Sequence, residues 1–546
     1  MKKRWVVAEK ISEDLREQLL ANRGLQKNSE IKKFSHAHLN LLTPAAQLFP
    51  HLEKAVSRLN NAIKNKELIY IYGDYDVDGV TASAILWETI DFLGGKVMPY
   101  IPSRKAEGYG LHSEALESLA REGAKVVVSV DCGITAVEQA EIAKKLGIDL
   151  IITDHHQPAE RLPKPFALVH TTELSGSGVA FRLAEELLKS FDKETDEQFY
   201  RNLELATLGT ISDMVPLVSD NRIIVKNGLK LLGKSERLGL KSLFEEAAIG
   251  KVVGTYEVGF VISPRLNAMG RLDSAMDSLR LLLTRNKGRA RELALKLGTT
   301  NKERQEKTKE VFEHAKAVYE KDQNGVKFIV IDSATYPEGV VGLVASRLVE
   351  AYHRPTAVIG KGEKVFKGSA RSISGFNITN ALNTQKKLLE SHGGHPMAAG
   401  FSIQEENIPT FRKNLVEIAE KELKEEDLVP ILKIDIEISL AQINPGLEEI
   451  LKEFEPFGVG NPEAVFLTKN LEVREVKLMG AEAQHLKMIL SDQNGKTLTA
   501  VGFNLAGKSP KKGELVDLCY NIRENYWNSR KTLEARIKDL ELSKPS

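Results

Sequence analysis

Cysteine is almost absent from this chain of 546 residues, which contains only Cys132 and Cys519. Two cysteines cannot form a disulfide framework or a cysteine-based zinc site. Their scarcity is typical of proteins that work in a reducing compartment. We therefore expect a cytoplasmic protein without structural disulfides.

Long apolar runs are missing too. No stretch approaches the roughly 18 apolar residues of a membrane-spanning helix, and residues 1–10 lack the apolar core of a signal peptide. We therefore expect no membrane association.

Net charge is small as well, at +1 from 76 basic and 75 acidic residues. A nucleic-acid surface would have to come from local clusters of Lys and Arg.

The length of the chain predicts three or four domains, because a single hydrophobic core does not grow so large. Strands and helices alternate between residues 51 and 285, which favours a doubly wound parallel sheet. The expected strands are residues 68–73, 96–101, 126–130, 149–153 and 166–170. The expected helices between them are residues 80–92, 113–122 and 135–146.

The remaining sequence predicts an N-terminal segment at residues 1–50 and three further regions. Residues 286–323 are highly charged with a thin apolar stripe, which is typical of a long helix that links domains. A smaller α/β domain is expected at 324–428, with helices that include residues 378–389. Five short strands within residues 429–546 predict an antiparallel barrel, of OB-fold type. These strands are residues 471–478, 485–490, 497–503, 515–523 and 533–540.

Acidic side chains gather where three strands of the first sheet end. Ligands of open α/β sheets bind at the carboxyl ends of the strands, so these side chains are expected to converge. Divalent cations are the natural compensation for so much negative charge, and carboxylates mixed with imidazole suit Mn²⁺ or Mg²⁺. The set is Asp74, Asp76, Asp78, Asp131, Asp154, His155 and His156, and Asp213 adds a carboxylate from an expected helix-terminal loop.

The first three aspartates alternate, so an extended chain would place Asp74, Asp76 and Asp78 on one face. Gly79 allows a sharp turn, and the next helix is expected to begin at Val80. A single aspartate at a strand end is usually a helix cap or a turn former. Acidic groups at three strand ends together favour a metal site instead.

The motifs at these positions resemble those of the DHH phosphoesterase superfamily and, within it, the bacterial RecJ-type exonucleases that act on single-stranded DNA. They are Gly-Asp-Tyr-Asp-Val-Asp-Gly at 73–79, Asp-Cys-Gly at 131–133 and Asp-His-His at 154–156. The resemblance covers roughly residues 40–545, and it implies a DHH domain at 51–285 and a DHHA1-type domain at 324–428. One position departs from the family pattern, because Tyr336-Pro337 stands where RecJ-type chains have Trp-His.

The resemblance implies two divalent cations, Mn²⁺ or Mg²⁺. It assigns one ion to Asp76 and Asp131, with help from Asp74. It assigns the other ion to Asp78, Asp131, His155 and Asp213. His156 would face the scissile phosphate, with Asp154 supporting it. Two ions about 4 Å apart activate water and stabilise the attacking and leaving oxygens, so no covalent nucleophile is needed.

A phosphate-binding stretch is expected at residues 368–371. Ser369 and Arg371 offer a hydroxyl and a guanidinium on what we expect to be a flexible Gly-rich loop. In RecJ-type enzymes this stretch binds the terminal 5′-phosphate together with the arginine that corresponds to Arg104. His395, in an expected mobile Gly-Gly-His loop, is compatible with a further phosphate contact.

Two other groups of residues are candidates for DNA contacts. Arg265 and Arg271 would either contact the DNA backbone or brace a domain interface. Tyr526 and Trp527 lie among cations in a hairpin-like stretch and suit stacking on unpaired bases, although a barrel also needs aromatic residues in its core. The rest of that stretch comprises Tyr520, Arg523, Arg530 and Lys531.

The resemblance thus implies a metal-dependent 5′→3′ exonuclease for single-stranded DNA in repair and recombination. A monomer is expected, and a helicase and a single-strand-binding protein are the partners implied by the family. Two alternatives are a phosphodiesterase for cyclic dinucleotides or short oligoribonucleotides, and a non-catalytic DNA-binding replication factor. The chain length and the barrel disfavour the first alternative, and the intact acidic set disfavours the second.

Overall fold

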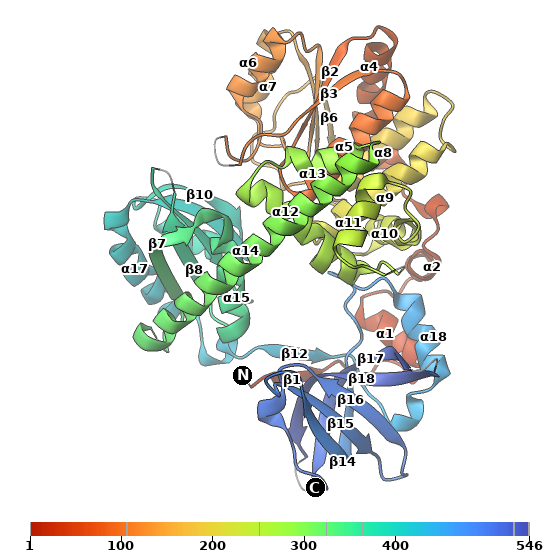
Figure 1. Ribbon diagram of the computed structural model, residues 1–546, viewed down its shortest axis with the longest axis vertical. Helices are drawn as coiled ribbons and strands as arrows, with labels where there is room; N and C mark the ends of the chain where they lie inside the picture. The colour runs from red at the N-terminus through yellow and green to blue at the C-terminus, as the bar shows by residue number, and fades with distance from the viewer. Residues whose placement is uncertain are drawn as a thin grey trace. The chain divides into compact units, whose positions relative to one another are not determined.

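The structure is a computed structural model, and it describes residues 2–104, 107–250, 252–323, 325–362, 364–527 and 530–543. Figure 1 shows the order of the elements along the chain. The chain divides into two compact units, which are described separately. One unit is Met1–Val6 with Thr299–Leu432, and the other is Val7–Gly298 with Lys433–Ser546.

Five parallel strands form the first sheet, in the order β3-β2-β4-β5-β6. They are β2 (Leu68–Gly73), β3 (Lys96–Tyr100), β4 (Val126–Val130), β5 (Asp149–Asp154) and β6 (Ala167–His170). Successive side chains of a strand point to opposite faces. In β2, Ile69 and Ile71 therefore pack in one hydrophobic core, while Tyr70 and Tyr72 pack in another.

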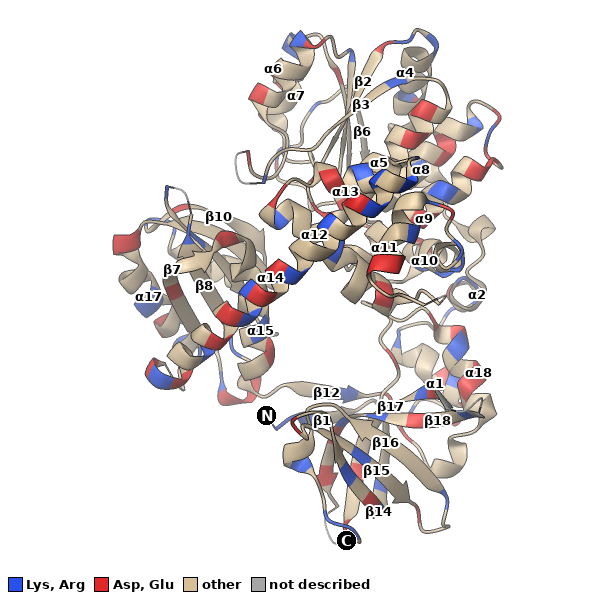
Figure 2. Ribbon diagram, viewed as in Figure 1, with Lys and Arg blue, Asp and Glu red and all other residues tan. Residues whose placement is uncertain are grey.

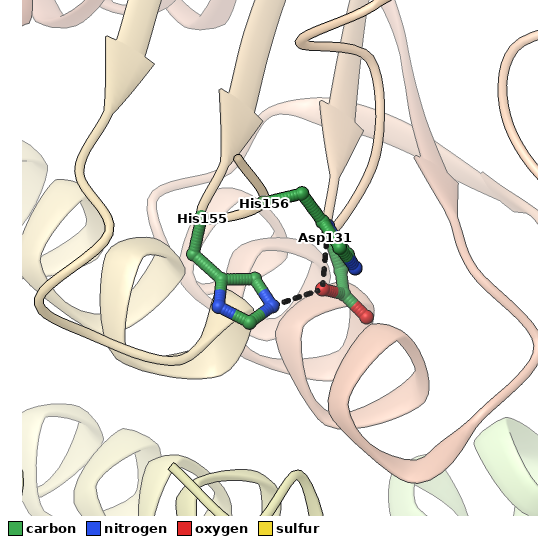
Figure 3. A group of neighbouring side chains, drawn as sticks. All are labelled: Asp131, His155 and His156. Atoms are coloured by element: carbon green, nitrogen blue, oxygen red, sulfur yellow. Dashed lines mark ion pairs between the residues drawn. The ribbon is translucent and has the colours of Figure 1, made fainter. Parts of the chain in front are cut away.

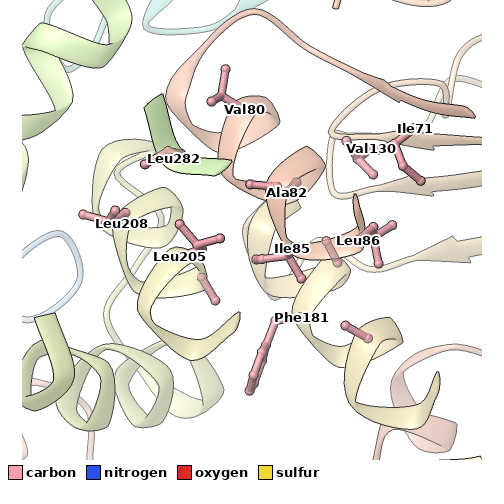
Figure 4. Close-up of a cluster of buried hydrophobic side chains, with 14 of the residues drawn as sticks. Ile71, Val80, Ala82, Ile85, Leu86, Val130, Phe181, Leu205, Leu208 and Leu282 are labelled. Carbon is pink, nitrogen blue, oxygen red and sulfur yellow. The ribbon is translucent and has the colours of Figure 1, made fainter. Parts of the chain in front are cut away.

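Helices cover both faces of this sheet, which confirms the predicted doubly wound arrangement. Side chains of α6 and α7 complete one core, and those of α4, α5, α8 and α9 complete the other (Figures 1 and 4). The helices of this domain are α3 (Ala45–Leu48), α4 (Leu52–Lys64), α5 (Val77–Phe92), α6 (Ser113–Arg121), α7 (Val137–Lys145), α8 (Gly176–Lys189), α9 (Glu197–Ser212), α10 (Ser219–Leu232), α11 (Leu238–Glu246), a π-helical turn (Glu257–Ile262), α12 (Ser263–Leu272) and α13 (Met276–Leu283).

A single helix of 36 residues, α14 (Lys287–Asp322), follows this domain, as the charged segment predicts. Acidic and basic residues are interspersed along its visible surface (Figure 2). At 1.5 Å per residue it is about 54 Å long. The boundary between the two compact units falls inside this helix.

The second sheet lies in the other unit and has the order β10-β11-β9-β8-β7. Only the β7–β8 pair is parallel. Its strands are β7 (Ile329–Pro337), β8 (Thr356–Lys361), β9 (Phe366–Arg371), β10 (Leu389–His395) and β11 (Ala398–Ile403). Its helices are α15 (Glu338–Tyr352), α16 (Ile378–Thr384) and α17 (Ile408–Glu422).

Two strands of this sheet correct the sequence-based expectation of flexible loops. The stretch around Ser369 forms strand β9. Within this strand, Gly368 packs so closely on Phe401 that a Cβ at position 368 would lie 2.1 Å from the Phe401 ring. The stretch that ends in His395 is strand β10, paired with β11. The expected helix at 378–389 is therefore wrong at its end, because pairing with β11 outweighs local helix preference from Leu389 onward.

The C-terminal strands close into a five-stranded barrel, β14-β15-β16-β18-β17, with β14 pairing back to β17. The barrel is formed by β14 (Phe466–Met479), β15 (His485–Ser491), β16 (Thr497–Gly502), β17 (Leu515–Trp527) and β18 (Arg530–Leu542), and β13 (Ile436–Glu437) pairs with β14. Three helices share its core, namely α1 (Leu15–Asn22), α2 (Asn28–His36) and α18 (Pro445–Phe454). The predicted barrel is thus confirmed.

Two short elements complete the description. Strand β1 (Arg4–Val7) pairs with β12 (Ile431–Ile434) in a separate two-stranded sheet. Among the described residues, no helix combines the length and the apolar character needed to cross a membrane.

Candidate metal centre

Three strands of the first sheet deliver acidic groups to one edge, as the sequence predicts. Asp74 follows β2, Asp131 follows β4 and Asp154 is the last residue of β5. Asp131 has a left-handed backbone with φ of 60°, a conformation that few residues other than glycine, asparagine and aspartate adopt readily. This local strain lies at a candidate ligand, where strained residues often occur.

Helix α5 begins earlier than predicted, at Val77. Asp76 caps it, with its side chain accepting hydrogen bonds from the backbone N–H groups of Asp78 (2.9 Å) and Gly79 (3.1 Å). The three aspartates therefore do not share one extended face, because Asp78 lies in the first helical turn. The cap folds the chain so that the carboxylates still approach one another.

Asp78 is buried and held by the start of α8. Its carboxylate accepts hydrogen bonds from the backbone N–H groups of Gly176 (2.6 Å) and Ser177 (2.9 Å). A Cβ at Gly176 would lie 2.5 Å from Asp131 Oδ1, and one at Gly209 would lie 2.5 Å from Asp78 Oδ1. Both glycines are therefore required for the close approach of α8 and α9, a role that only the three-dimensional structure reveals.

His155 joins the aspartates from the loop after β5. Its Nε2 lies 3.1 Å from Asp131 Oδ1, 3.6 Å from Asp213 Oδ2 and 3.8 Å from Asp78 Oδ2. Asp213 caps the C-terminus of α9, which agrees with the predicted helix-terminal loop. Figure 3 shows His155 and His156 both directed toward Asp131.

The candidate ligands form three overlapping groups whose ligand atoms lie within 4.8 Å of one another. The first group contains the residues that the resemblance assigns to one ion, and the second contains those assigned to the other ion except Asp131. Asp131 belongs to the first group and the third, and His155 to the second and the third, so the groups are contiguous. The groups are Asp74 with Asp76 and Asp131, Asp78 with His155 and Asp213, and Asp131 with His155 and His156.

Several buried atoms in these groups have no hydrogen-bond partner among the described residues. They are Asp74 Oδ1, Asp131 Oδ1 and His155 Nε2. Buried polar atoms are nearly always satisfied, so three unsatisfied ligand-type atoms at one place indicate that another group completes the site. Oxygen and imidazole donors fit Mn²⁺ or Mg²⁺.

Electrostatic repulsion leads to the same conclusion. Burial, reinforced by the charges of Asp78 and Asp76, raises the pKa of Asp131 well above its ordinary value. Burial and Asp78 likewise raise the pKa of Asp213 to about 9. Carboxyl groups in this state hold protons that a cation would displace. The site therefore has the properties expected of an acidic metal centre.

Asp154 organises the two histidines rather than joining the ligand groups. Its Oδ1 accepts hydrogen bonds from the backbone N–H groups of His155 (2.7 Å) and His156 (3.2 Å) and lies 2.8 Å from His156 Nδ1. Its Oδ2 accepts from Ile134 N–H at 2.8 Å. Burial alone would lower the pKa of His156, but the hydrogen bond with Asp154 raises it. This pairing fixes the orientation of the His156 ring.

Two tyrosines that sequence reasoning did not single out flank the centre. Tyr109 packs against His156, with ring centroids 5.6 Å apart at 64°, and its hydroxyl lies 3.2 Å from His156 Nδ1. The guanidinium of Arg104 lies 5.3 Å from the ring centroid of Tyr75. Arg104, for which a 5′-phosphate contact is predicted, therefore lies beside the Asp74–Asp76 loop.

Helix α12 packs on the same loop. Asn267 Oδ1 accepts a hydrogen bond from Val77 N–H at 3.1 Å, and a Cβ at Gly270 would lie 2.5 Å from Tyr75 O. Burial and Asp74 raise the pKa of Tyr75 to about 12, an effect that the charges of Arg104 and Arg271 oppose. Asn267 was also not identified from the sequence.

The two arginines predicted in this helix differ in their surroundings. Arg265 Nε donates to Glu246 Oε2 at 2.7 Å, so Arg265 braces α12 against α11. This contact lies within the first domain, so both roles left open for Arg265, a DNA-backbone contact and the bracing of a domain interface, stay predictions. Arg271 directly follows Gly270, which packs against the backbone of Tyr75.

The other unit holds the remaining phosphate candidates on one sheet face. Arg371 Nη1 donates to Ser369 Oγ at 2.8 Å, and both residues alternate outward along β9. Arg371 lies opposite Ala398, which lies opposite His395, so these three side chains share a face. Nearby Tyr336, part of the departure from the family pattern, is buried with its hydroxyl 2.5 Å from His314 Nδ1.

The hairpin of the barrel contains the residues considered for base stacking, and the structure describes only some of them. Tyr520 is fully buried and its hydroxyl lies 2.7 Å from Thr468 Oγ1, so it belongs to the core. Arg523 is paired with Glu463, and Lys531 with an acidic partner as well. The side chains of Tyr526, Trp527 and Arg530 lie outside the part of the chain that the structure describes.

Comparison with known proteins adds family information to this geometry. Three family models match the chain, the DHH family N-terminal domain at residues 68–210, the DHHA1 domain at 325–421 and the RecJ OB domain at 434–539. The single-stranded-DNA-specific exonuclease RecJ of Bacillus subtilis (strain 168) is 37% identical over 552 residues, covering 96% of this chain and 67% of the relative. RecJ of Haemophilus influenzae is 31% identical and covers 96% of each chain.

The chain belongs to the RecJ family. Solved structures agree with this assignment. The crystal structure of RecJ from Thermus thermophilus in complex with Mn²⁺ matches with a TM-score of 0.85 at 28% identity, covering 100% of this chain and 80% of that one. The Mg²⁺ complex of the same RecJ matches with a TM-score of 0.78, covering 79% of that chain.

Proposed function

We propose that this chain is a metal-dependent exonuclease that hydrolyses single-stranded DNA from its 5′ end, in DNA repair and recombination. The observation that carries the proposal is the set of three contiguous ligand groups containing buried, unsatisfied carboxylate and imidazole atoms. Relatives named as single-stranded-DNA-specific exonucleases, and RecJ structures with Mn²⁺ and Mg²⁺, support it.

The proposed ligands of two divalent ions combine these groups with the assignment that the family resemblance implies. Asp74, Asp76 and Asp131 would hold one ion. Asp78, Asp131, His155 and Asp213 would hold the other, with Asp131 shared. When bound, the ions would activate a water molecule and stabilise the attacking and leaving oxygens of an in-line displacement.

The protein's own groups supply orientation and charge. Asp154 keeps His156 in one orientation, and the raised pKa of His156 favours an imidazolium that donates from Nε2 to a phosphate oxygen. The N–H groups of Gly176 and Ser177 hold Asp78 in place. Preorganised donors and ligands of this kind lower the barrier without having to rearrange during the reaction.

A terminal 5′-phosphate would be recognised by basic side chains and a serine hydroxyl. Ser369 and Arg371 are the proposed primary contacts in their unit, and His395 shares their sheet face. Arg104 and Arg271 are proposed contacts beside the metal centre. A guanidinium paired with a hydroxyl suits the bidentate recognition of phosphate.

We further propose that the protein is a cytoplasmic monomer that works with a helicase and a single-strand-binding protein. Both cysteines are buried and neither takes part in a disulfide, which fits a reducing compartment.

The decisive experiment is digestion of end-labelled single strands of about 20 nucleotides with Mn²⁺ or Mg²⁺. Release of labelled mononucleotide from 5′-labelled strands at the earliest times, with 3′-labelled strands shortening only gradually, is the expected result. Faster hydrolysis of dinucleotides than of the long strand would favour the small-substrate alternative. Tight binding without hydrolysis would favour a non-catalytic DNA-binding factor.

A further inference from the structure

Two aromatic side chains are unusually exposed for their size. Tyr256 and Phe260 are 57% and 71% exposed. Their ring centroids are 5.1 Å apart and the ring planes are inclined by 25°, so the rings stack on each other. Exposure of two neighbouring rings costs free energy in water unless another flat apolar group covers them. We refer to these two residues as the stacking pair.

The stacking pair lies on the segment that flanks Asp213. Tyr256 precedes, and Phe260 lies within, a π-helical turn, a rare element that often occurs at functional sites. A Cβ at Gly259 would lie 3.9 Å from Ile211, and the hydroxyls of Ser263 and Ser212 are hydrogen bonded. Since Ile211 and Ser212 immediately precede Asp213, the turn packs against the end of α9 that supplies this candidate ligand.

The continuation of the turn, α12, contacts the other candidate ion group. Asn267 and Gly270 pack on the loop from Tyr75 to Val77. The π-helical turn and α12 thus run alongside the metal centre, with the stacking pair toward Asp213. Arg104 lies toward Asp74 instead, beside the ring of Tyr75.

We propose that Tyr256 and Phe260 form a platform on which unpaired bases of the DNA strand stack, on the Asp213 side of the metal centre. This inference rests on the proposed function. Every base has a flat π face, so stacking tolerates any sequence, as a general exonuclease requires. The charged side chain of the turn, Glu257, accepts a hydrogen bond from Gly254 N–H at 2.8 Å, so the platform itself acts through its rings rather than through charge.

The location of the stacking pair beside the metal centre favours a DNA base, rather than a protein surface, as the group that covers it. The stacking pair flanks the groups that would cleave the strand, and a strand held at those groups must pass one side or the other. A second copy of this chain, or another protein, would instead bury the two rings in an apolar protein–protein interface. These occupants are distinguished by the experiment that follows.

The test measures the binding of the full chain to a fluorescein-labelled oligo(dT) by anisotropy, with EDTA present to prevent hydrolysis. Tyr256→Ala and Phe260→Ala are each expected to weaken binding about tenfold, as expected for the loss of one stacked base. Phe260→Trp, which keeps a flat ring, should bind within about twofold of wild type. Tyr200→Ala is the matched control, because Tyr200 is 46% exposed on α9 but lies about 18 Å before the end that carries Asp213.

The salt dependence of binding supplies a second readout. Stacking releases no counterions, so the slope of log affinity against log salt should be the same in Phe260→Ala as in wild type. Unchanged affinity in both alanine variants, or a loss equal to that of Tyr200→Ala, would overturn the inference. A changed oligomeric state in size-exclusion chromatography, with unchanged DNA affinity, would overturn it in favour of a protein contact.

Failure of this inference is distinguishable from failure of the proposed function. If wild type neither binds nor digests single strands, the proposed function fails and the platform fails with it. If wild type digests single strands and the alanine variants bind them as tightly, the platform alone is refuted.

Discussion

Asp131 is the residue whose replacement is most informative. Asp131→Asn keeps the size of the side chain and tolerates the left-handed backbone, whereas any bulkier side chain would meet Gly176, so the fold should survive. The variant removes the charge that two of the three ligand groups share. Because this carboxyl is buried among other acids, its loss should also leave the metal-free protein at least as stable as wild type.

The magnitude follows from the chemistry that the shared ligand supports. Metal ions supply several kcal/mol of charge stabilisation in the transition state. If Asp131→Asn removes about 4 kcal/mol of this transition-state stabilisation, the rate of DNA hydrolysis falls about 1,000-fold, since each 1.36 kcal/mol is a factor of ten. Binding of oligo(dT), which depends on other residues, should stay within about threefold of wild type.

The assay is single-turnover digestion of a 5′-labelled strand with Mn²⁺, accompanied by thermal unfolding. Asp192→Asn is the matched control, because Asp192 has the same left-handed backbone, with φ of 56°, on an exposed turn. The reasoning is refuted if Asp131→Asn retains turnover within tenfold of wild type. A large loss of stability in the metal-free variant would equally contradict the repulsion on which the site is built.

Three further predictions concern pH and the neighbouring residues. The raised pKa of Asp213, about 9, means that this group stabilises the metal-free fold at low pH and that this stabilisation is lost as pH rises from about 4 toward 9. The gain in Tm on adding Mn²⁺ should therefore grow between pH 6 and pH 8, and a constant gain would argue against coupled proton release. Asp154→Asn should lower kcat about 10- to 100-fold, because His156 loses its orientation and its raised pKa, and the high-pH side of the rate profile should shift to lower pH. Arg371→Ala should abolish most of the preference for 5′-phosphorylated over 5′-hydroxyl strands in competition assays, whereas Arg371→Lys should retain part of it.

Much of the fold follows from local patterns. The three central strands of the first sheet, β2, β4 and β5, are buried on both faces and read as short apolar runs, so their positions could be predicted within a residue or two. Strands β9 and β10 could not be predicted in the same way, because glycines interrupt them and their pairing with β11 comes from distant sequence. The start of α5 was misjudged because Asp76 reads equally well as a ligand and as a cap.

The candidate metal ligands were also accessible from sequence, since strand ends of a parallel sheet must meet at one edge. The residues that position these ligands could not be predicted from the sequence. Gly176 and Gly209 matter only because α8 and α9 approach the carboxylates closely, and Tyr109 and Asn267 contact the site across long stretches of chain. Such contacts depend on tertiary packing, which no local pattern encodes.

The proposed chemistry depends on two neighbouring divalent cations held by these residues. Anomalous diffraction from crystals of the full chain grown with Mn²⁺ would locate them. Two peaks about 4 Å apart, one beside Asp76 and one beside His155 with Asp131 between them, are the expected result. A single peak, or two peaks that do not share Asp131, would contradict this proposal.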